Sequence, residues 1–374
     1  MSNLGNFICD IDSKYDCDKE PFARGANGLV YKGTFKDKEI KNLVAIKKIY
    51  MHDISDNFEY KKYFWREVEL LSSINHPFCL KIINFSIEPP IIVTPLMSEG
   101  TLDKLLERND PDTFNATQKM CTIYALCSTM SAIHSIGIIH RDLKPANIFM
   151  QKNDDLYDIF IADFGSARKV DKNGDITVNP KITPKYAAPE TFEENIYSNS
   201  IDVYSFGVIF YQYFKYELVF ENGTRPQTTY AFMNNITKNI RFVRLKEMND
   251  DQYLIYTKCT NNNDLERPTF KILTQLFEEK ESLWLPGVDK SIFLRYVERC
   301  KKIYQDFITA NQHIVQLNEV SPVKSKQSFN LTRSTRLRRS RSSLQTLNTT
   351  TAPQSVPSRC RSTRSIKHID YDEK

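Results

Sequence analysis

The sequence predicts an α+β fold in which a small, strand-rich part precedes a larger, mainly helical part. The runs at 44–47 and 91–94 have the composition typical of strands, and 22–33 has the pattern of a strand, a small-residue turn and a second strand. Between them, 58–74 has apolar residues at helical spacing and ends at the helix-breaking string Asn-His-Pro. A longer helix is predicted for 116–136, which ends at a glycine, and another very apolar helical segment follows.

Composition and charge indicate a globular protein with a basic tail. Of the 374 residues, 41% are hydrophobic and 26% are charged, which is ordinary for a chain that buries a core. The net charge is +5, but 321–374 has 12 Lys and Arg against 3 Asp and Glu, so the tail carries +9 and the preceding part −4. The tail also has 18 Ser and Thr and few large apolar residues, so we expect it to be disordered.

The cysteine pattern and the features of signal peptides and membrane spans bear on the expected cellular location. The eight cysteines are scattered with no C-x-x-C pair, which favours free thiols in a reducing compartment. No N-terminal stretch has the order of a signal peptide, and no run approaches the ~20 apolar residues of a membrane span. We therefore expect a soluble cytoplasmic protein whose basic tail is compatible with entry into the nucleus.

The most informative stretch is a polar loop between two apolar runs at 138–149. It contains Asp142, Lys144 and Asn147. A carboxylate can orient a hydroxyl group, an ammonium group can face developing phosphate charge, and an amide can bind a metal ion. These three groups at this spacing predict phosphoryl transfer.

The string at 140–147, His-Arg-Asp-Leu-Lys-Pro-Ala-Asn, resembles the catalytic loop of eukaryotic protein kinases, and Lys144-Pro145 is the serine/threonine-kinase form. The resemblance implies a two-lobed fold, with a small, mostly antiparallel β N-lobe carrying one regulatory helix and a larger, mainly helical C-lobe. It also implies transfer of the γ-phosphate of ATP, in which Asp142 orients the substrate hydroxyl and Lys144 stabilises the transferring charge.

A glycine-containing hairpin resembles the kinase Gly-rich loop, G-x-G-x-x-G-x-V, with one departure. Gly25, Gly28 and Val30 match, but Ala23 replaces the first glycine. Small residues let the backbone approach phosphates closely. Alanine keeps the position small but disfavours positive φ.

Val44-Ala45-Ile46-Lys47 matches the kinase V-A-I-K motif, whose lysine binds the α- and β-phosphates. Glu67, in the predicted helix 58–74, is expected to pair with Lys47 and to make the position of that helix a switch. Glu59 and Glu69 are the alternatives, and both are more typical of a solvated helix face.

The strand at 91–94 leads into Pro95-Leu96-Met97, which resembles the hinge between kinase lobes. The resemblance implies that adenine accepts a hydrogen bond from the Met97 N–H and donates one to the Pro95 carbonyl, so the N–H that proline lacks is not needed. Thr94 takes the gatekeeper position, where its short side chain should leave a pocket behind the adenine open.

Asp163-Phe164-Gly165 follows a predicted strand and resembles the kinase D-F-G motif, so Asp163 and Asn147 are expected to bind Mg²⁺. The resemblance implies the following nucleotide-contacting residues: Ala23, Gly25, Ala26, Asn27, Gly28, Val30, Ala45, Lys47, Thr94, Pro95, Met97, Asn147, Phe149 and Asp163.

The aperiodic segment 166–187 resembles a kinase activation segment, which closes at Thr183 in a T-x-x-Y-x-A-P-E motif. Thr183 is expected to contact the catalytic loop. Thr177 is a candidate phosphorylation site, because a phosphate there could pair with Arg141 and order the segment. An unmodified, exposed threonine is the alternative.

Two later motifs extend the resemblance to roughly 22–277. Asp202, near the start of an apolar helix, can cap backbone N–H groups, and in kinases this aspartate holds the catalytic loop. The following Tyr-Ser-Phe-Gly resembles tyrosine-kinase-like serine/threonine kinases. Arg267 is expected to form an ion pair with Glu190.

These observations divide the chain into an N-terminal leader, a kinase domain, a helical extension and a tail. The expected bounds are 1–18 for the leader, 19–280 for the domain (N-lobe about 19–95, C-lobe about 98–280), 281–320 for the extension and 321–374 for the tail. The extension is expected to pack on the C-lobe, with partner binding as the alternative. The tail would attract acidic protein surfaces, anionic lipid or nucleic acid through its Arg- and Ser-rich stretch at 334–343, which has no aromatic residue for base stacking.

We therefore expect a signalling protein serine/threonine kinase that uses ATP and Mg²⁺. The main alternative is a pseudokinase, an ATP-binding scaffold with the same fold. Its usual signature is loss of Lys47, Asp142 or Asp163, and all three are present. A tyrosine-specific kinase is disfavoured by Lys144-Pro145.

Overall fold

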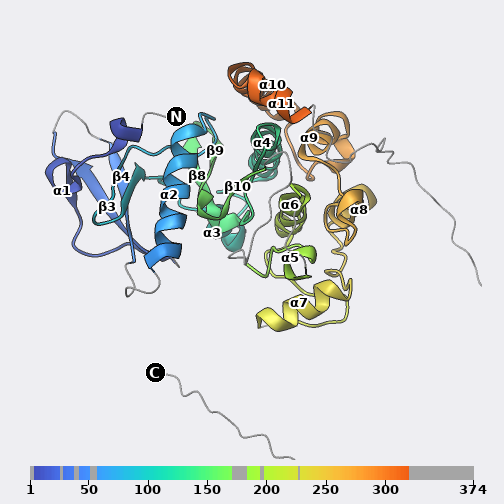
Figure 1. Ribbon diagram of the computed structural model, residues 1–374. Helices are drawn as coiled ribbons and strands as arrows, with labels where there is room; N and C mark the ends of the chain where they lie inside the picture. The colour runs from blue at the N-terminus through green and yellow to red at the C-terminus, as the bar shows by residue number, and fades with distance from the viewer. Residues whose placement is uncertain are drawn as a thin grey trace, which may run out of the picture. The chain divides into compact units, whose positions relative to one another are not determined.

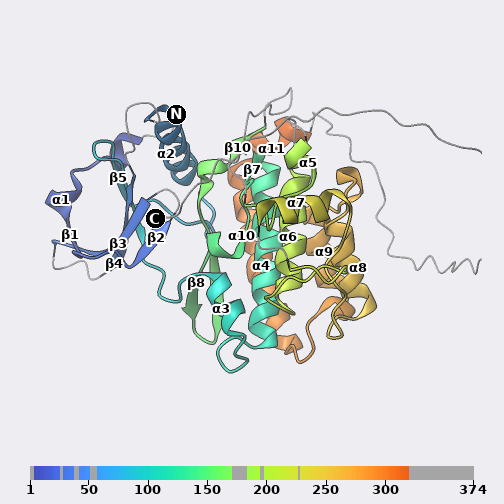
Figure 2. The ribbon, with the colours of Figure 1, turned by 90° about the horizontal axis from the view of Figure 1, so that it is seen from below.

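The architecture is that of a computed structural model, which describes residues 4–25, 28–37, 42–50, 57–170, 183–193, 198–225 and 228–319. All of these belong to the first of two units into which the chain divides. Figures 1 and 2 show a small lobe of strands with one long helix beside a larger, helical lobe. The disordered tail predicted for 321–374 lies outside the described residues.

The small lobe is built on a six-stranded antiparallel sheet with the order β1-β3-β4-β6-β5, in which β2 also pairs with β3. The strands are β1 Tyr15–Cys17, β2 Ala23–Gly25, β3 Gly28–Phe35, β4 Leu43–Ile49, β5 Asn84–Ser86 and β6 Ile91–Pro95. A Cβ atom at Gly28 would lie 2.2 Å from the carbonyl oxygen of Lys48. Glycine therefore lets β3 approach β4 closely at the start of the strand.

The strand register divides the side chains of this sheet between two faces. Ala23 lies opposite Val30, Val30 opposite Lys47, and Ala45 opposite Thr94. Directly opposite residues share a face, and so do residues two apart on one strand. Hence these five side chains, which come from four strands, lie on the same side of the sheet.

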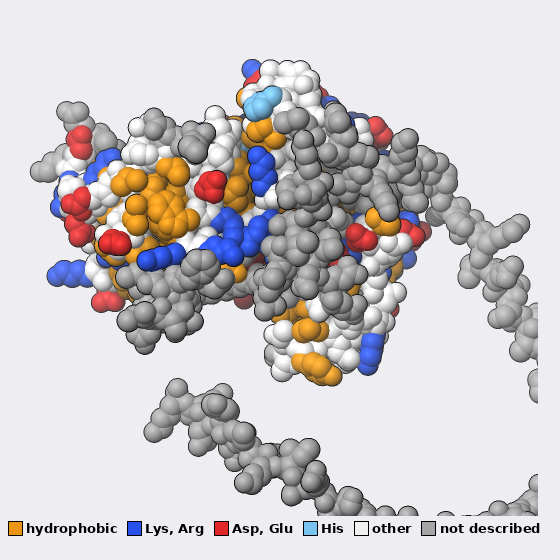
Figure 3. Space-filling model, in the orientation of Figure 1, with side chains coloured by type: hydrophobic (Ala, Val, Ile, Leu, Met, Phe, Trp, Pro, Cys, Tyr) orange, Lys and Arg blue, Asp and Glu red, His pale blue; other side chains and the backbone are white. Residues whose placement is uncertain are grey.

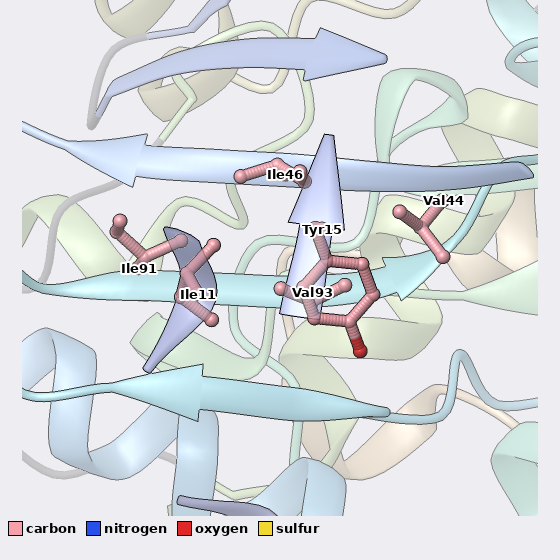
Figure 4. Close-up of a cluster of buried hydrophobic side chains, with 6 residues drawn as sticks. All are labelled: Ile11, Tyr15, Val44, Ile46, Ile91 and Val93. Carbon is pink, nitrogen blue, oxygen red and sulfur yellow. The ribbon is translucent and has the colours of Figure 1, made fainter. Parts of the chain in front are cut away.

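The N-terminal segment covers the other face. After a 3₁₀ turn at Leu4–Phe7, Ile11 in α1 (Ile11–Lys14) and Tyr15 in β1 are only 4% and 2% exposed. Figure 4 shows them among the apolar side chains of this face, Val44, Ile46, Ile91 and Val93. The sequence predicts only a leader at 1–18, because a short polar stretch without clear periodicity does not reveal burial against strands that come later.

Helix α2 (Asn57–Ser73) is the long helix of the small lobe. Phe64, Val68 and Leu71 are buried at helical spacing, and Phe64 packs edge-to-face on Phe85 of β5 with 6.2 Å between ring centroids. Figure 3 shows hydrophobic side chains gathered on one outer surface of this lobe and Lys and Arg side chains between the lobes.

The large lobe is mainly helical. Its main helices are α3 Leu102–Arg108, α4 Ala116–Ser135, α5 Glu190–Glu193, α6 Ser200–Gln212, α7 Thr229–Thr237, α8 Asp250–Cys259 and α9 Phe270–Glu279. Every α6 residue from Ile201 to Gln212 is buried, so α6 forms the centre of the lobe. The two-lobed α+β fold expected from the sequence is confirmed.

Two short strand pairs lie between the helices and carry the polar loops. They are β7 (Ile138–Ile139) with β10 (Arg168–Lys169), and β8 (Ile148–Asn153) with β9 (Leu156–Ile161). The loop predicted for phosphoryl transfer joins β7 to β8, and the Asp-Phe-Gly turn follows β9 directly.

Two further helices, α10 (Lys290–Ala310) and α11 (Gln312–Glu319), follow the large lobe, and α10 packs along α4 (Figures 1 and 2). Their buried side chains are Phe293, Tyr296, Val297, Cys300 and Phe307. These side chains pack α10 on the lobe. Within the described part of the chain, no helix combines the length and apolar character needed to cross a membrane.

Candidate active site

The loop between β7 and β8 is held from beneath by one buried carboxylate. Asp202 of α6 is fully buried and accepts hydrogen bonds from the backbone N–H groups of His140 and Arg141, each at 2.8 Å, and lies 2.9 Å from His134 Nε2. Burial opposes its charge, but these hydrogen bonds and the neighbouring histidines hold the pKa of Asp202 below its usual value. The sequence suggested helix capping as well, but α6 begins at Ser200 and the carboxylate bonds the loop instead.

The backbone of the loop is locally unusual, and His140 supports it. Arg141 has φ of 71°, in the left-handed region that non-glycine residues rarely adopt. The fully buried His140 donates from Nε2 to the Ala162 carbonyl at 3.0 Å, and its Nδ1 accepts from the Asp142 N–H at 3.3 Å. The ring therefore fixes the loop relative to the strand that leads to Asp163.

Asp142 is the centre of a compact polar network. One carboxylate oxygen accepts a hydrogen bond from the Thr183 hydroxyl, and the other accepts one from Lys144 Nζ, both at 2.7 Å. Lys144 Nζ also donates to Thr183 at 2.8 Å, and the Asn147 amide donates to the Asp142 carbonyl at 2.8 Å. Because its nitrogen is bound in this way, Asn147 presents its amide oxygen as the atom able to bind a metal.

A second charged group links the sheet to α2. Lys47 Nζ of β4 lies 2.8 Å from both carboxylate oxygens of Glu67, and the two side chains are 24% and 9% exposed. Burial disfavours the ammonium charge, but the carboxylates of Glu67 and Asp163 outweigh it and raise the pKa of Lys47. Lys47 is therefore a permanent cation, and Asp163 is close enough to act on it electrostatically.

The Asp-Phe-Gly turn lies beside both groups. Asp163 is in the left-handed region with φ of 62°, and Phe164 is fully buried with its ring centroid 5.0 Å from that of His140. Arg66 of α2 donates to the Gly165 carbonyl at 3.0 Å. Through Arg66 and Glu67, consecutive residues of α2 thus contact the turn and the lysine.

The remaining residues suggested for nucleotide contacts line the sheet and the connection to the large lobe. Pro95 lies opposite Val44 at the end of β6, and the N–H of Leu96 donates to the Leu43 carbonyl at 3.1 Å. Met97 is largely buried, and Phe149 forms a bridge with Thr101 at the start of α3. Gly25 lies opposite Gly28, whereas Ala26 and Asn27 lie outside the described residues.

The end of the segment that resembles an activation segment is fixed to the large lobe. Arg267, whose side chain is fully buried, forms a bidentate pair with Glu190 at 2.6 and 2.8 Å. The Ser205 hydroxyl of α6 donates to the Tyr186 carbonyl at 2.8 Å. Thr177 lies outside the described residues, so its pairing with Arg141 stays a prediction.

Two residues of the site, Arg66 and His134, were not predicted from the sequence. Arg66 directly precedes Glu67, so its place beside a predicted site residue was the available signal. His134, the partner of Asp202, lies in a helix whose buried positions are mostly apolar, and nothing local distinguishes it.

Comparisons with known proteins agree with this geometry. The family model of the protein kinase domain matches residues 18–279. This chain belongs to the protein kinase family. The expected family and its class, ATP-dependent protein kinases, are thereby confirmed.

Curated relatives share this region at moderate identity. Serine/threonine/tyrosine-protein kinase HT1 of Arabidopsis thaliana is 28% identical over 71% of this chain and 67% of its own length. Serine/threonine-protein kinase STY46 of the same plant is 28% identical over 78% of this chain and 48% of its own. Dual specificity protein kinase shkE of Dictyostelium discoideum is 30% identical over 76% and 39%. The match thus spans half or less of the second and third relatives.

Proposed function

We propose that the chain is a protein serine/threonine kinase that transfers the γ-phosphate of ATP to Ser or Thr hydroxyls of protein substrates in a signalling role. The observation that carries the proposal is that two charged pairs, Lys47 with Glu67 and Asp142 with Lys144, are both formed. The Lys47–Glu67 pair is formed at 2.8 Å, and Asp142 is bonded to Lys144 at 2.7 Å. Asp163 is close enough to Lys47 to act on it electrostatically.

The sheet face that carries Ala23, Val30, Ala45, Lys47 and Thr94 is the proposed nucleotide surface. Small and apolar side chains there fit a flat adenine ring, and Lys47 would bind the α- and β-phosphates. In the connection to the large lobe, the Pro95 carbonyl and the Met97 N–H would bond the adenine edge. Gly25 and Gly28 would let the backbone approach the phosphates.

The residues present also fit Mg²⁺. The Asn147 amide oxygen and the Asp163 carboxylate would hold it, and both are the hard oxygen donors that Mg²⁺ prefers. When bound, Mg²⁺ would supply positive charge that offsets the negative charge of the phosphates. The hydrogen bonds from the Asn147 nitrogen to Asp142 orient its amide before any ion binds.

At the acceptor side, Asp142 is the proposed group that binds and orients the substrate hydroxyl. Its contact with the Thr183 hydroxyl at 2.7 Å is of the kind that a substrate Ser or Thr would make. Lys144 places its charge next to the same carboxylate and would stabilise negative charge on the transferring group. Such a site acts mainly by positioning and electrostatics.

Tyrosine phosphorylation beside serine and threonine phosphorylation is the second candidate. The printed names of two relatives, Serine/threonine/tyrosine-protein kinase HT1 and Dual specificity protein kinase shkE, favour testing it. Lys144, bonded to both Asp142 and Thr183, supports the Ser/Thr assignment.

The test is Mg²⁺-dependent transfer of labelled γ-phosphate to a generic Ser/Thr protein and to a tyrosine peptide. Asp142→Asn should abolish transfer while ATP binding persists, and the exposed-site variant Asp16→Asn should behave as wild type. If the wild type binds ATP but transfers no phosphate, the alternative of a pseudokinase scaffold would be supported instead. Transfer that survives in Asp142→Asn would remove the role of Asp142.

Other parts of the proposal concern regulation and surroundings. We propose Thr177 as an activating phosphosite paired with Arg141, so Thr177→Ala should lower activity.

The bounds 19–280 for the domain, 281–320 for the extension and 321–374 for the tail are likewise proposed. The tail is proposed to bind acidic surfaces, anionic lipid or nucleic acid in a salt-sensitive manner. Free buried thiols such as Cys127 and Cys259 favour a cytoplasmic location.

A further inference from the structure

The helices α10 and α11 lie beyond residue 279, where the match to the family model ends. They are nevertheless in contact with three segments that lead directly to site residues. These segments are the loop after α2, the strand β9, and the end of α4.

The first contact joins α10 to the loop that follows α2. The Phe307 ring packs edge-to-face on His76, with 5.1 Å between centroids and 70° between planes. Both residues are buried, at 4% and 1% exposed. His76 Nδ1 accepts from the Phe78 N–H at 3.2 Å, so His76 is also part of the turn that follows α2.

The second contact centres on Arg299 of α10. It forms a bidentate pair with Asp158 of β9 at 2.7 and 2.8 Å, and its guanidinium group lies 5.5 Å from the centre of the Phe78 ring. One side chain therefore ties the loop after α2 to β9, the strand that leads to Asp163. The Tyr296 hydroxyl adds a bond to the Tyr157 carbonyl of β9 at 3.3 Å.

The third contact involves α11. The Asn318 amide donates to the Ser135 carbonyl at the end of α4, at 3.1 Å. Gly137, with φ of 76°, follows within two residues, and a Cβ atom there would lie 3.1 Å from the Asn318 nitrogen. The chain enters the catalytic loop immediately after this point.

We propose that α10 and α11 form a built-in positioning element, in which Phe307 and Arg299 hold the loop after α2 and thereby keep Glu67 against Lys47. Glu67 lies nine residues before His76 on the helix that ends in this loop. A displacement of this loop would be transmitted to Glu67, because a packed helix moves as a rigid unit. The proposal rests on the kinase function proposed above.

The test compares two phenylalanines of the same helix. Phe307→Ala removes the contact with His76. Phe293→Ala is the matched control, because Phe293 is fully buried but packs on Tyr124 and Trp284 in the large lobe. Kinetics with ATP as varied substrate are measured for both, with thermal unfolding as a record of stability. Phe307→Leu, which keeps an apolar side chain, serves as the conservative variant.

For Phe307→Ala, kcat/KM for ATP should fall about tenfold, in the range of coupling through packed networks, with a rise in KM. Phe307→Leu should recover most of the loss, and Phe293→Ala should lower the unfolding temperature without changing KM. In a Glu67→Gln background the effect of Phe307→Ala should shrink to about twofold or less, because the two act through one contact. Equal KM changes in both alanine variants, or a full tenfold effect without Glu67, would overturn the proposal.

A spectroscopic readout separates this inference from the enzymatic proposal. The chain has two tryptophans, and Trp65 on α2 is 38% exposed. In a Trp284→Phe background, Phe307→Ala should shift Trp65 emission and quenching, whereas Phe293→Ala should not. If Phe307→Ala shifts the Trp65 emission but the wild type transfers no phosphate, only the proposed kinase function is rejected. If the Trp65 emission is unchanged, the positioning role is rejected. If Phe307→Ala does not fold, Arg299→Gln, at a partly exposed side chain, is measured in the same way.

Discussion

Replacing Asp202 by Asn should destabilise the protein strongly although the two side chains have nearly the same shape. One carboxylate oxygen accepts from the His140 N–H and meets His134 Nε2, and the other accepts from the Arg141 N–H. An asparagine can turn its oxygen toward only one of these sides. Its NH₂ group then faces a buried N–H donor, and the less costly orientation leaves the Arg141 N–H without an acceptor.

The magnitude follows from those contacts. Losing one charge-assisted hydrogen bond and leaving one buried donor unpaired costs about 2–4 kcal/mol of unfolding free energy. For a chain of this size, that corresponds to roughly 4–8 °C in the unfolding temperature. Arg141 already has φ of 71°, so the released backbone should also relax and displace the neighbouring Asp142, which lowers activity.

Thermal unfolding and phosphate transfer should be measured together, with the exposed Asp16→Asn as control. Because folding lowers the pKa of Asp202 below 3.8, its contribution to stability is present above that pH and is lost as the pH falls through the folded-state pKa. The difference between wild type and Asp202→Asn should thus be complete at pH 7 and shrink only below about pH 4. A variant within about 0.5 kcal/mol of the wild type at pH 7 would refute the reasoning.

Three further predictions concern other parts of the site. Glu67→Gln should lower kcat/KM for ATP by about 10- to 100-fold, because Lys47 loses the carboxylate that positions it; unchanged ATP kinetics would contradict this. Arg267→Met should cost about 3–5 kcal/mol in thermal unfolding, because it leaves Glu190 largely buried without its partner, whereas a loss below 1 kcal/mol would show that the pair is dispensable. Burial lowers the pKa of His76 from 6.5 to about 4, so the unfolded chain binds the proton more readily and the free energy of unfolding should fall as the pH drops from 6.5 to 4. In His76→Phe, the fall between pH 7 and 5 should be smaller by about 2 kcal/mol. Parallel curves of unfolding free energy against pH for the two proteins would exclude His76 as the cause.

The secondary structure near the site could be predicted because the signals are local. The runs at 22–33, 44–47 and 91–94 correspond to β2 with β3, β4 and β6, and the helix predicted for 58–74 differs by one residue from α2 at each end. Alternation and helical spacing are properties of neighbouring residues, so they survive without knowledge of the tertiary fold. The N-terminal strand β1 was missed because its burial depends on strands that follow it.

The family, the two-lobed fold and the order of the motifs were determined by the sequence alone, since each motif is a contiguous string such as 140–147. Only the tertiary structure decided which distant groups meet. Arg66 reaches Gly165, Asp202 binds His134, and Arg299 binds Asp158 across 99, 68 and 141 residues of chain. Pairings at such separations depend on how helices and strands pack, and a one-dimensional pattern does not record that packing.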